Sequence, residues 1–371
     1  MGKWTLVLIS VLGTASAALG QDSDASSQDR YGDPLPAGSH ARYGTLRFRS
    51  AEDVQAAAFL PDGASFVTMT TNEISVWEIS TGKKTRAIPV QGGCALAVSP
   101  DGDAIALGMS NGRVGLFRLG TEERNIWQVD GATTGDQPLA FSPDGGTLAV
   151  GTASGSVQLF DSTTCQELRS FADHARSIAA VAWSPDGKWL AFGGADSRND
   201  QSPASGVYLV DTESWEETAL FEGHPDQVSS IAFSPRGITL ASASRDGTII
   251  LRDVPGGREL ARLKEKGAPI GVLRFTPDGG ALVASAAGKV VRWVLGEDPE
   301  AERWEAPGPG SSVVDLSADG TRALLAQGQF AHPWQPGSAK KAVVPDGHSS
   351  GVHAVLPIPL MNLVATGGGD G

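Results

Sequence analysis

The segment VSSIAFSPRGITLASASRDGTIILRD, residues 228–253, shows the pattern from which the architecture follows. It consists of three apolar runs of strand length separated by two polar turns, SPRG at 234–237 and RDG at 245–247. In the first turn Pro235 presets φ at the second turn position, and Gly237 takes the positive φ that closes a short hairpin. The segment therefore predicts three antiparallel strands joined by tight turns.

The first of these turns recurs along the chain with a regular period. Its second position advances in steps of 39, 43, 42, 50, 42 and 41 residues, and the 50-residue step contains a polar run that we interpret as a loop insertion. The seven turns are LPDG (60–63), SPDG (99–102, 142–145 and 184–187), SPRG (234–237), TPDG (276–279) and SADG (317–320). Each unit also has room for a fourth, more polar strand, such as residues 258–263. Because one such unit cannot bury its apolar faces alone, we expect an all-β fold in which four-stranded antiparallel sheets stack around a common axis as a β-propeller.

The repeat resembles the WD-repeat family over residues 44–371. Gly223-His224 and Gly347-His348 match the Gly-His of that family, Asp173-His174 is a variant, and the Trp-Asp ending is degenerate. The resemblance implies a buried hydrogen-bond network of a His, a strand Ser or Thr, a turn Asp and a Trp. It assigns these structural roles to His174, His224, Ser242, Asp246, His348, Thr366 and Asp370, while Arg252 replaces one Trp. The fourth unit, with Trp183 to Phe192, is instead similar to TolB-type propeller repeats.

A truncated eighth unit follows the seven complete ones. A shift of 124 residues overlays His224 on His348, Ser242 on Thr366 and Asp246 on Asp370, and the match ends before a third strand. Two closures remain open: seven blades, with the eighth unit beginning a second propeller, or eight blades with the last one damaged. The close match of the eighth unit to the fifth favours eight, and both closures predict that the chain continues past Gly371. Residues 44–49 are the candidate strand that clasps the ring.

The amino terminus predicts export. Residues 1–20 combine Lys3, a short apolar run and Ala15-Ser16-Ala17, which is the pattern of a signal peptide, although a buried strand or helix is the alternative. The apolar run is too short to span a membrane as a helix. Residues 21–43 are polar and predict a flexible lead-in to the propeller. We therefore expect a periplasmic, cell-surface or secreted protein without a membrane span.

The charge of the chain argues against a nucleic-acid partner, and its cysteine content argues against a disulfide. The chain has 29 basic and 42 acidic side chains, a net charge of −13, and this field repels nucleic acid. Its two cysteines, Cys94 and Cys165, occupy non-equivalent positions in different repeats, which makes a disulfide unfavourable. The expected partner is a protein or peptide.

The sequence favours a binding scaffold over an enzyme. His348 and His353 are poorly spaced for a metal, and Asp101-Gly102-Asp103 is explained as a repeat turn, so we predict no metal, no cofactor and no catalytic residues. The innermost strands read as almost free of charge, which argues against the alternative of a propeller enzyme or small-ligand binder using the central channel. The insertion in the fourth unit, with Asp196, Arg198, Asn199 and Asp200, is the candidate partner-contact loop.

Overall fold

The structure is a computed structural model. It describes residues 48–121, 123–131, 138–172, 175, 177–195, 205–265, 267–296, 299–305, 312–317, 321–327, 329–335, 352–358 and 363–368. At positions 312–314, 316, 327, 332, 352–358 and 363–368 the backbone alone is described. The signal peptide and lead-in predicted for residues 1–43 lie outside these ranges.

Every regular element in the described residues is a β-strand. Six sheets have four antiparallel strands, with sequential order within each sheet. They are β1 (Ala56–Phe59), β2 (Ser65–Met69), β3 (Glu73–Glu78) and β4 (Lys84–Pro89); β5 (Gly93–Val98), β6 (Ala104–Met109), β7 (Arg113–Arg118) and β8 (Arg124–Gln128); β9 (Leu139–Phe141), β10 (Thr147–Gly151), β11 (Val157–Asp161) and β12 (Glu167–Phe171); β13 (Ser177–Trp183), β14 (Trp189–Ala195), β15 (Ser205–Asp211) and β16 (Glu217–His224); β17 (Val228–Phe233), β18 (Thr239–Ser244), β19 (Thr248–Asp253) and β20 (Glu259–Lys264); and β21 (Ile270–Phe275), β22 (Ala281–Ala286), β23 (Lys289–Val294) and β24 (Glu300–Glu305).

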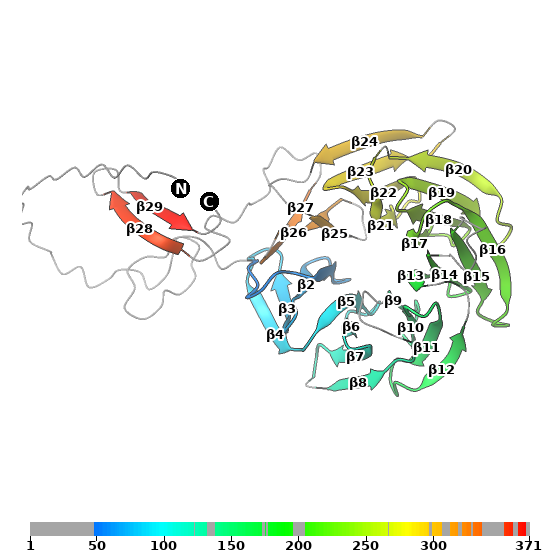
Figure 1. Ribbon diagram of the computed structural model, residues 1–371, viewed down its shortest axis with the longest axis horizontal. Coiled ribbons are helices and arrows are strands. Elements are labelled where there is room, and N and C mark those ends of the chain that lie inside the picture. The colour runs from blue at the N-terminus through cyan, green and yellow to red at the C-terminus, as the bar shows by residue number, and fades with distance from the viewer. Residues whose placement is uncertain are drawn as a thin grey trace, which may run out of the picture. The chain divides into compact units, whose positions relative to one another are not determined.

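The seventh sheet has three strands, and the eighth unit forms a hairpin. The seventh consists of β25 (Ser312–Leu316), β26 (Ala323–Gln327) and β27 (Phe330–Trp334), and the hairpin consists of β28 (Val352–Ile358) and β29 (Leu363–Gly368). The first strand of each of the seven sheets faces the centre of a ring, and the outermost strands form its rim (Figure 1). The predicted β-propeller architecture is confirmed.

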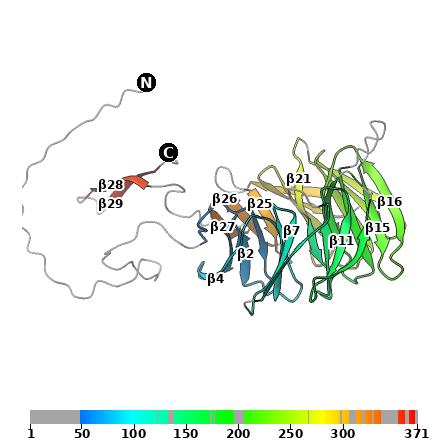
Figure 2. The ribbon, with the colours of Figure 1, turned by 60° about the horizontal axis from the view of Figure 1, so that its bottom comes forward.

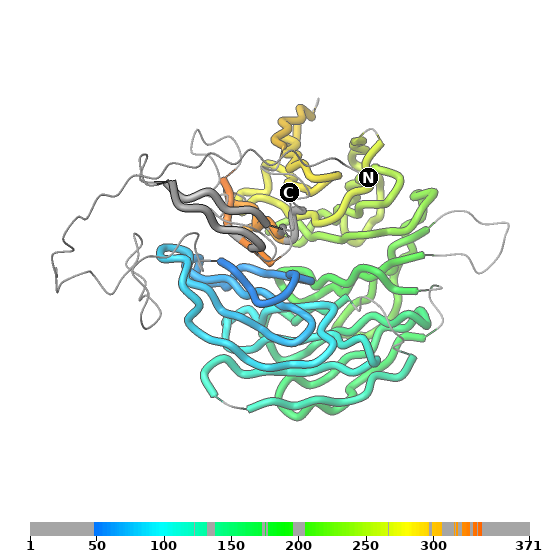
Figure 3. The backbone as a smooth tube through the Cα atoms, turned by 60° about the vertical axis from the view of Figure 1, so that its left-hand side comes forward, coloured from blue at the N-terminus to red at the C-terminus, as the bar shows by residue number. Residues whose placement is uncertain are grey.

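The ring contains seven blades, so the preference for eight was wrong. Strand β25 contacts β1, which closes the circle between the seventh blade and the first, and Figure 3 shows these orange and blue segments side by side. The amino-terminal clasp is present at Arg49, which forms an antiparallel bridge with Phe330 on the open edge of β27. Two backbone bonds flank it: Ser50 donates to Gln329 at 2.7 Å, and Ala331 donates to Phe48 at 3.1 Å. With this clasp the seventh blade needs no strand from the eighth unit.

The hydrophobic core is divided into seven clusters, one at each boundary between neighbouring blades. Successive side chains of a strand point to opposite faces, so Ile105 and Leu107 of β6 pack against the first blade, whereas Ala104 and Ala106 pack against the third. All four are at most 1% exposed. The closing boundary is built the same way, by Phe66 and Trp77 of the first blade with Leu324 and Ala331 of the seventh. Each blade is thus buried on both faces by its two neighbours. Figure 2 shows the blades standing side by side around the ring.

The recurring turn joins the first and second strands of each blade. In the fourth blade the hydroxyl of Ser184 donates to Asp186 Oδ1 at 2.6 Å and accepts from the backbone N–H of Trp189 at 2.9 Å. The same pair of bonds occurs at Ser142 in the third blade and at Thr276 in the sixth. The hydroxyl at the first turn position therefore donates a hydrogen bond to the Asp carboxylate and accepts one from the backbone N–H at the start of the following strand. This double role explains why Ser or Thr precedes Pro in most repeats.

Successive turns also touch one another around the ring. A Cβ on Gly102 would lie 3.3 Å from Pro61 Cδ of the preceding blade, and one on Gly279 would lie 3.5 Å from Pro235 Cδ. Both glycines have φ above +70°. The Pro and the Gly of the motif therefore serve the packing between blades as well as the turn itself. We call the face of the ring that bears these turns the turn face.

Candidate functional site

The predicted structural network is brought together at the boundary between the fourth and fifth blades. His224 is 1% exposed at the end of β16. Its Nε2 lies 2.8 Å from the hydroxyl of Ser242 in β18, and its Nδ1 lies 2.9 Å from the hydroxyl of Thr248 in β19. Burial lowers the pKa of His224 from 6.5 to about 4, although the nearby Asp246 carboxylate acts in the opposite direction. The imidazole is therefore neutral at pH 7, and it links the end of β16 in the fourth blade to β18 and β19 of the fifth blade.

Asp246 joins this network through a residue that sequence reasoning missed. Its Oδ1 accepts hydrogen bonds from the hydroxyl of Thr248 at 2.6 Å and from the backbone N–H of Thr248 at 2.7 Å. Thr248 thus stands between the Asp and the His. Asp246 Oδ2 is buried and accepts no hydrogen bond from the described residues. The position of Thr248, two residues after Asp246 at the start of a strand, was the available signal.

Arg252 occupies the position of the missing Trp and makes different contacts. Its guanidinium carbon lies 5.7 Å from the centre of the Phe221 ring, and it donates to the backbone oxygen of Glu222. Glu259 adds an ion pair at 3.8 Å. Arg252 therefore packs over the strand that carries His224, and in the described part of the chain it forms no hydrogen bond with Ser242.

The other predicted site residues are not brought together in the described part of the chain. His174, His348, Asp370 and the loop residues Asp196, Arg198, Asn199 and Asp200 lie outside the described residues. Thr366 lies in β29, where the backbone alone is described. The roles assigned to these residues remain predictions. Cys94 and Cys165 do not form a disulfide.

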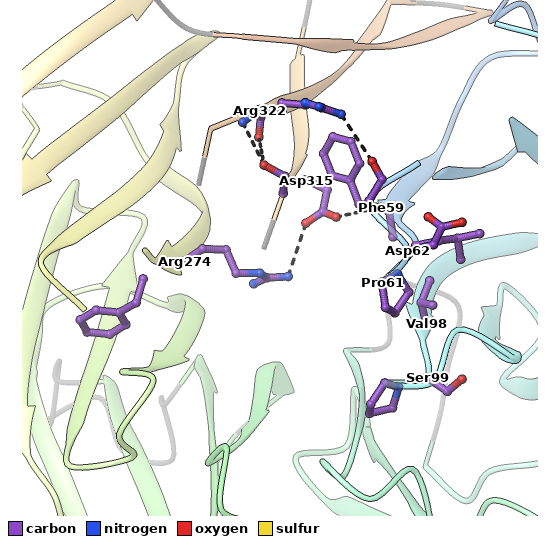
Figure 4. Close-up of a pocket in the computed structure, with 14 residues that line it drawn as sticks. Phe59, Pro61, Asp62, Val98, Ser99, Arg274, Asp315 and Arg322 are labelled. Atoms are coloured by element: carbon purple, nitrogen blue, oxygen red, sulfur yellow. Dashed lines mark hydrogen bonds and ion pairs between the residues drawn. The ribbon is translucent and has the colours of Figure 1, made fainter. Parts of the chain in front are cut away.

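A pocket of about 600 Å³ opens at the turn face, near the central channel. Its wall is formed by the turns of the first and second blades and by the innermost strands of the sixth and seventh (Figure 4). We call it the turn-face pocket; its lining residues are Ala58, Phe59, Leu60, Pro61, Asp62, Gly63, Val98, Ser99, Pro100, Arg274, Phe275, Asp315, Ser317 and Arg322. The pocket thus combines an apolar wall with two arginines and two aspartates.

Asp315 is the centre of the polar contacts in the turn-face pocket. Its Oδ2 accepts a hydrogen bond from the backbone N–H of Phe59 at 3.0 Å, and its Oδ1 lies 3.5 Å from Nη2 of Arg274. Arg322 reaches the backbone oxygen of Gly63 at 3.5 Å from the opposite side. Figure 4 shows Arg274 and Asp315 pointing toward one another across the pocket. These contacts connect the sixth, seventh and first blades.

The charged pair corrects one expectation from the sequence. Arg274 lies on β21 and Asp315 on β25, and both strands are innermost in their blades. The innermost strands are therefore not almost free of charge. The expectation was drawn from strands of the first, second and fourth blades, which are apolar, and did not extend to the blades beside the closing boundary.

Two family comparisons match parts of the chain. The family described as WD domain, G-beta repeat matches residues 215–253, which contain the His224 network. The family described as Anaphase-promoting complex subunit 4 WD40 domain matches residues 96–184. The seven-bladed ring and these two matches agree with each other. The chain is a WD-repeat β-propeller. Comparison with curated proteins returns no match.

WD-repeat propellers commonly mediate protein–protein interaction. In the described residues no group of three or more His, Cys, Asp or Glu is placed to hold a metal ion. No helix in the same residues is long and apolar enough to cross a membrane. The TolB-like character of the fourth blade is not tested by the family matches and stays a prediction.

Two serines, Ser110 and Ser349, lie in a hydrolase-like motif that sequence reasoning passed over. Ser349, in Gly-His-Ser-Ser-Gly at 347–351, lies outside the described residues. Residues 108–112 read Gly-Met-Ser-Asn-Gly, which fits the pattern G-x-S-x-G. In hydrolases that motif places the serine on a strand-to-helix turn. Here Ser110 is exposed in a turn that joins β6 to β7, two strands of one blade. The required context is absent at this serine, so the motif does not indicate a nucleophile.

Proposed function

We propose that this WD-repeat propeller is a non-catalytic scaffold that binds a protein or peptide partner outside the cytoplasm. The closed ring carries the proposal. Each blade is buried on both faces against its neighbours, so the surfaces available to a partner are the two loop-bearing faces and the rim. Because the blades are packed rigidly in the ring, these surfaces lose little conformational entropy when a partner binds. This rigidity favours binding of an extended partner.

The charge of the chain supports a protein partner over nucleic acid. The net charge of −13 repels phosphate backbones. The amino-terminal sequence supports export, because a basic residue, a short apolar run and Ala15-Ser16-Ala17 follow one another in the order typical of signal peptides. The substitution Leu8→Asp puts a charge into the apolar run and should retain the protein in the cell. Export that is unchanged by Leu8→Asp would contradict this part of the proposal.

Binding is tested with the full chain carrying a carboxy-terminal tag. Proteins recovered with it from the cell envelope and the medium are purified and titrated against it directly. The double variant Asp196→Ser/Asp200→Ser removes two charges from the candidate contact loop, and we expect weaker binding at an unchanged melting temperature. The matched control Glu213→Ser/Glu216→Ser removes two charges from the exposed turn between β15 and β16. Equal affinities for both variants would exclude the loop, and failure to retain any protein would contradict the scaffold role.

A small-ligand role remains the second candidate, because Arg274 and Asp315 place charge on innermost strands near the channel. A thermal-shift screen of the purified chain with metal ions and small metabolites separates the two candidates. A large, stoichiometric stabilisation by one compound would favour the small-ligand role.

A further inference from the structure

In the ion pair of the turn-face pocket, the arginine is more accessible than the aspartate. The side chain of Arg274 is 50% exposed, whereas that of Asp315 is 12% exposed. Asp315 also has both carboxylate oxygens engaged, one by Phe59 and the other by Arg274. The guanidinium of Arg274 is therefore more accessible to a ligand than the carboxylate of Asp315.

Arg274 retains hydrogen-bonding capacity toward the pocket. Its Nη1 donates to the backbone oxygen of Leu273 at 3.1 Å, and its Nη2 faces Asp315 at 3.5 Å, which is long for a charge-assisted hydrogen bond. A guanidinium has five N–H donors in a planar fork, and this fork matches the two oxygens of a carboxylate. Arg322 places a second guanidinium at the rim of the same pocket.

The remaining acidic group of the lining does not compete for Arg274. Asp62 lies in the turn of the first blade, and its Oδ1 accepts hydrogen bonds from the backbone N–H groups of Ala64 and Ser65, both at 2.9 Å. Asp62 therefore caps its own turn. Of the charged groups of the pocket, Asp315 is largely buried and paired with Arg274, whereas Asp62 is exposed and hydrogen-bonded to its own turn. Arg322 contacts the backbone of that same turn at Gly63.

The other part of the lining is apolar. Phe59, Pro61 and Val98 stand on one side in Figure 4, and Phe275 of the sixth blade also belongs to the lining. A volume of about 600 Å³ lies in the range of pockets that enclose a small ligand or a few residues of a peptide. The pocket thus fits a group that carries a carboxylate directly beside an apolar side chain.

We propose that the turn-face pocket binds the carboxy-terminal residue of a partner chain that ends in an apolar side chain, with Arg274 as the principal donor to the terminal carboxylate. This inference rests on the proposed role in protein binding and assigns that role a site. The apolar side chain packs against the turns of the first and second blades, and Arg322 adds a second positive charge at the rim.

The test uses the full chain and a synthetic probe, acetyl-Gly-Ala-Ala-Phe, with either a free carboxylate or a carboxy-terminal amide. We expect the free acid to bind about tenfold more tightly than the amide in calorimetry. Arg274→Gln should weaken binding of the acid by a similar factor, measured at a temperature at which thermal unfolding shows the variant to be fully folded. The control is Arg236→Gln, which removes the same charge from the fifth-blade turn on the same face, outside the pocket, and should leave affinity unchanged.

A second variant and a second probe make the result specific. Asp315→Asn removes the carboxylate that competes with the probe for Arg274, and its amide oxygen still accepts a hydrogen bond from Phe59. The acid probe should therefore bind more tightly to this variant than to the wild type. Phenylacetate tests a free small carboxylate, and binding as tight as that of the peptide would overturn a chain terminus as the ligand. Equal binding of acid and amide, or equal losses in Arg274→Gln and Arg236→Gln, would overturn the inference. If no probe binds but the recovered partner still does, the inference fails and the scaffold role stands.

Discussion

Asp315 accepts a hydrogen bond at 3.0 Å from the backbone N–H of Phe59, although 256 residues separate the two along the chain. The bond crosses the boundary where the seventh blade meets the first. Asp315 is 8% exposed, so loss of its carboxylate leaves a backbone donor without a partner in a poorly solvated place. This contact complements the Arg49–Phe330 bridge at the rim of the ring.

The first prediction is that Asp315→Ala weakens ring closure. We expect the free energy of unfolding to fall by about 1–3 kcal/mol, since a buried hydrogen bond and an ion pair are lost. Asp315→Asn should lose less because the amide oxygen still accepts from Phe59. Urea unfolding followed by tryptophan fluorescence measures both. Asp130→Ala, at an exposed position, is the control, and an equal loss in Asp130→Ala would contradict the role of Asp315.

The second prediction concerns the pH dependence of stability through His224. The pKa of this residue is about 4 in the folded protein and 6.5 without the fold. Between these values the unfolded chain binds the proton and the folded chain does not, so the contribution of the neutral His is complete above pH 6.5 and is lost as the pH falls toward 4. The loss at pH 5 should be about 2 kcal/mol.

The variant His224→Gln isolates this contribution. It should be less stable than the wild type at pH 7, because hydrogen bonds to Ser242 and Thr248 are disturbed. The difference between the two proteins should shrink as the pH is lowered from 7 to 5. A difference that stays constant over this range would show that His224 does not titrate as inferred.

The third prediction is that Arg252→Trp stabilises the fifth blade. In the first blade Trp77 Nε1 donates to the hydroxyl of Thr68 at 2.8 Å. Thr68 lies two residues after the strand partner of Trp77, and Ser242 lies two residues after the strand partner of Arg252. The two pairs are therefore equivalent. An indole at this position should gain that hydrogen bond and raise the free energy of unfolding by about 1 kcal/mol. Arg252→Gln, which removes the cation without adding a ring, should lower it; equal melting temperatures for the two variants would refute the prediction.

The fourth prediction compares two glycines with positive φ. A Cβ on Gly155, where φ is +83°, would lie 1.7 Å from the backbone oxygen of Ala175, whereas a Cβ on Gly63, where φ is +64°, would meet nothing within 4 Å. Gly63→Ala should therefore cost only the backbone strain, about 1–2 kcal/mol. Gly155→Ala adds a backbone clash and should cost about 3 kcal/mol or more. Thermal unfolding of both variants gives the comparison, and a Gly63→Ala loss as large as that of Gly155→Ala would contradict it.

Much of the local structure follows from the sequence alone. The turn motif predicts its own hairpin, because the hydroxyl of Ser184, the ring of Pro185, the carboxylate of Asp186 and the φ of Gly187 all act within five residues of one another. The Gly-His motif likewise predicts that His224 and Ser242 meet, since both positions belong to one repeat or its border. Interactions of this range are encoded in each unit and are repeated wherever the motif is repeated.

The number of blades and the turn-face pocket were settled by tertiary structure. The ring closes when the angles between neighbouring blades add up to a full turn. The sequence of a single repeat does not determine that total. The match of the eighth unit to the fifth therefore predicted another blade, while the contacts of Arg49 with Phe330 and of Asp315 with Phe59 closed the ring at seven. Arg274 meets Asp315 for the same reason: they lie in different repeats, and only the packing of blades around one axis brings them together.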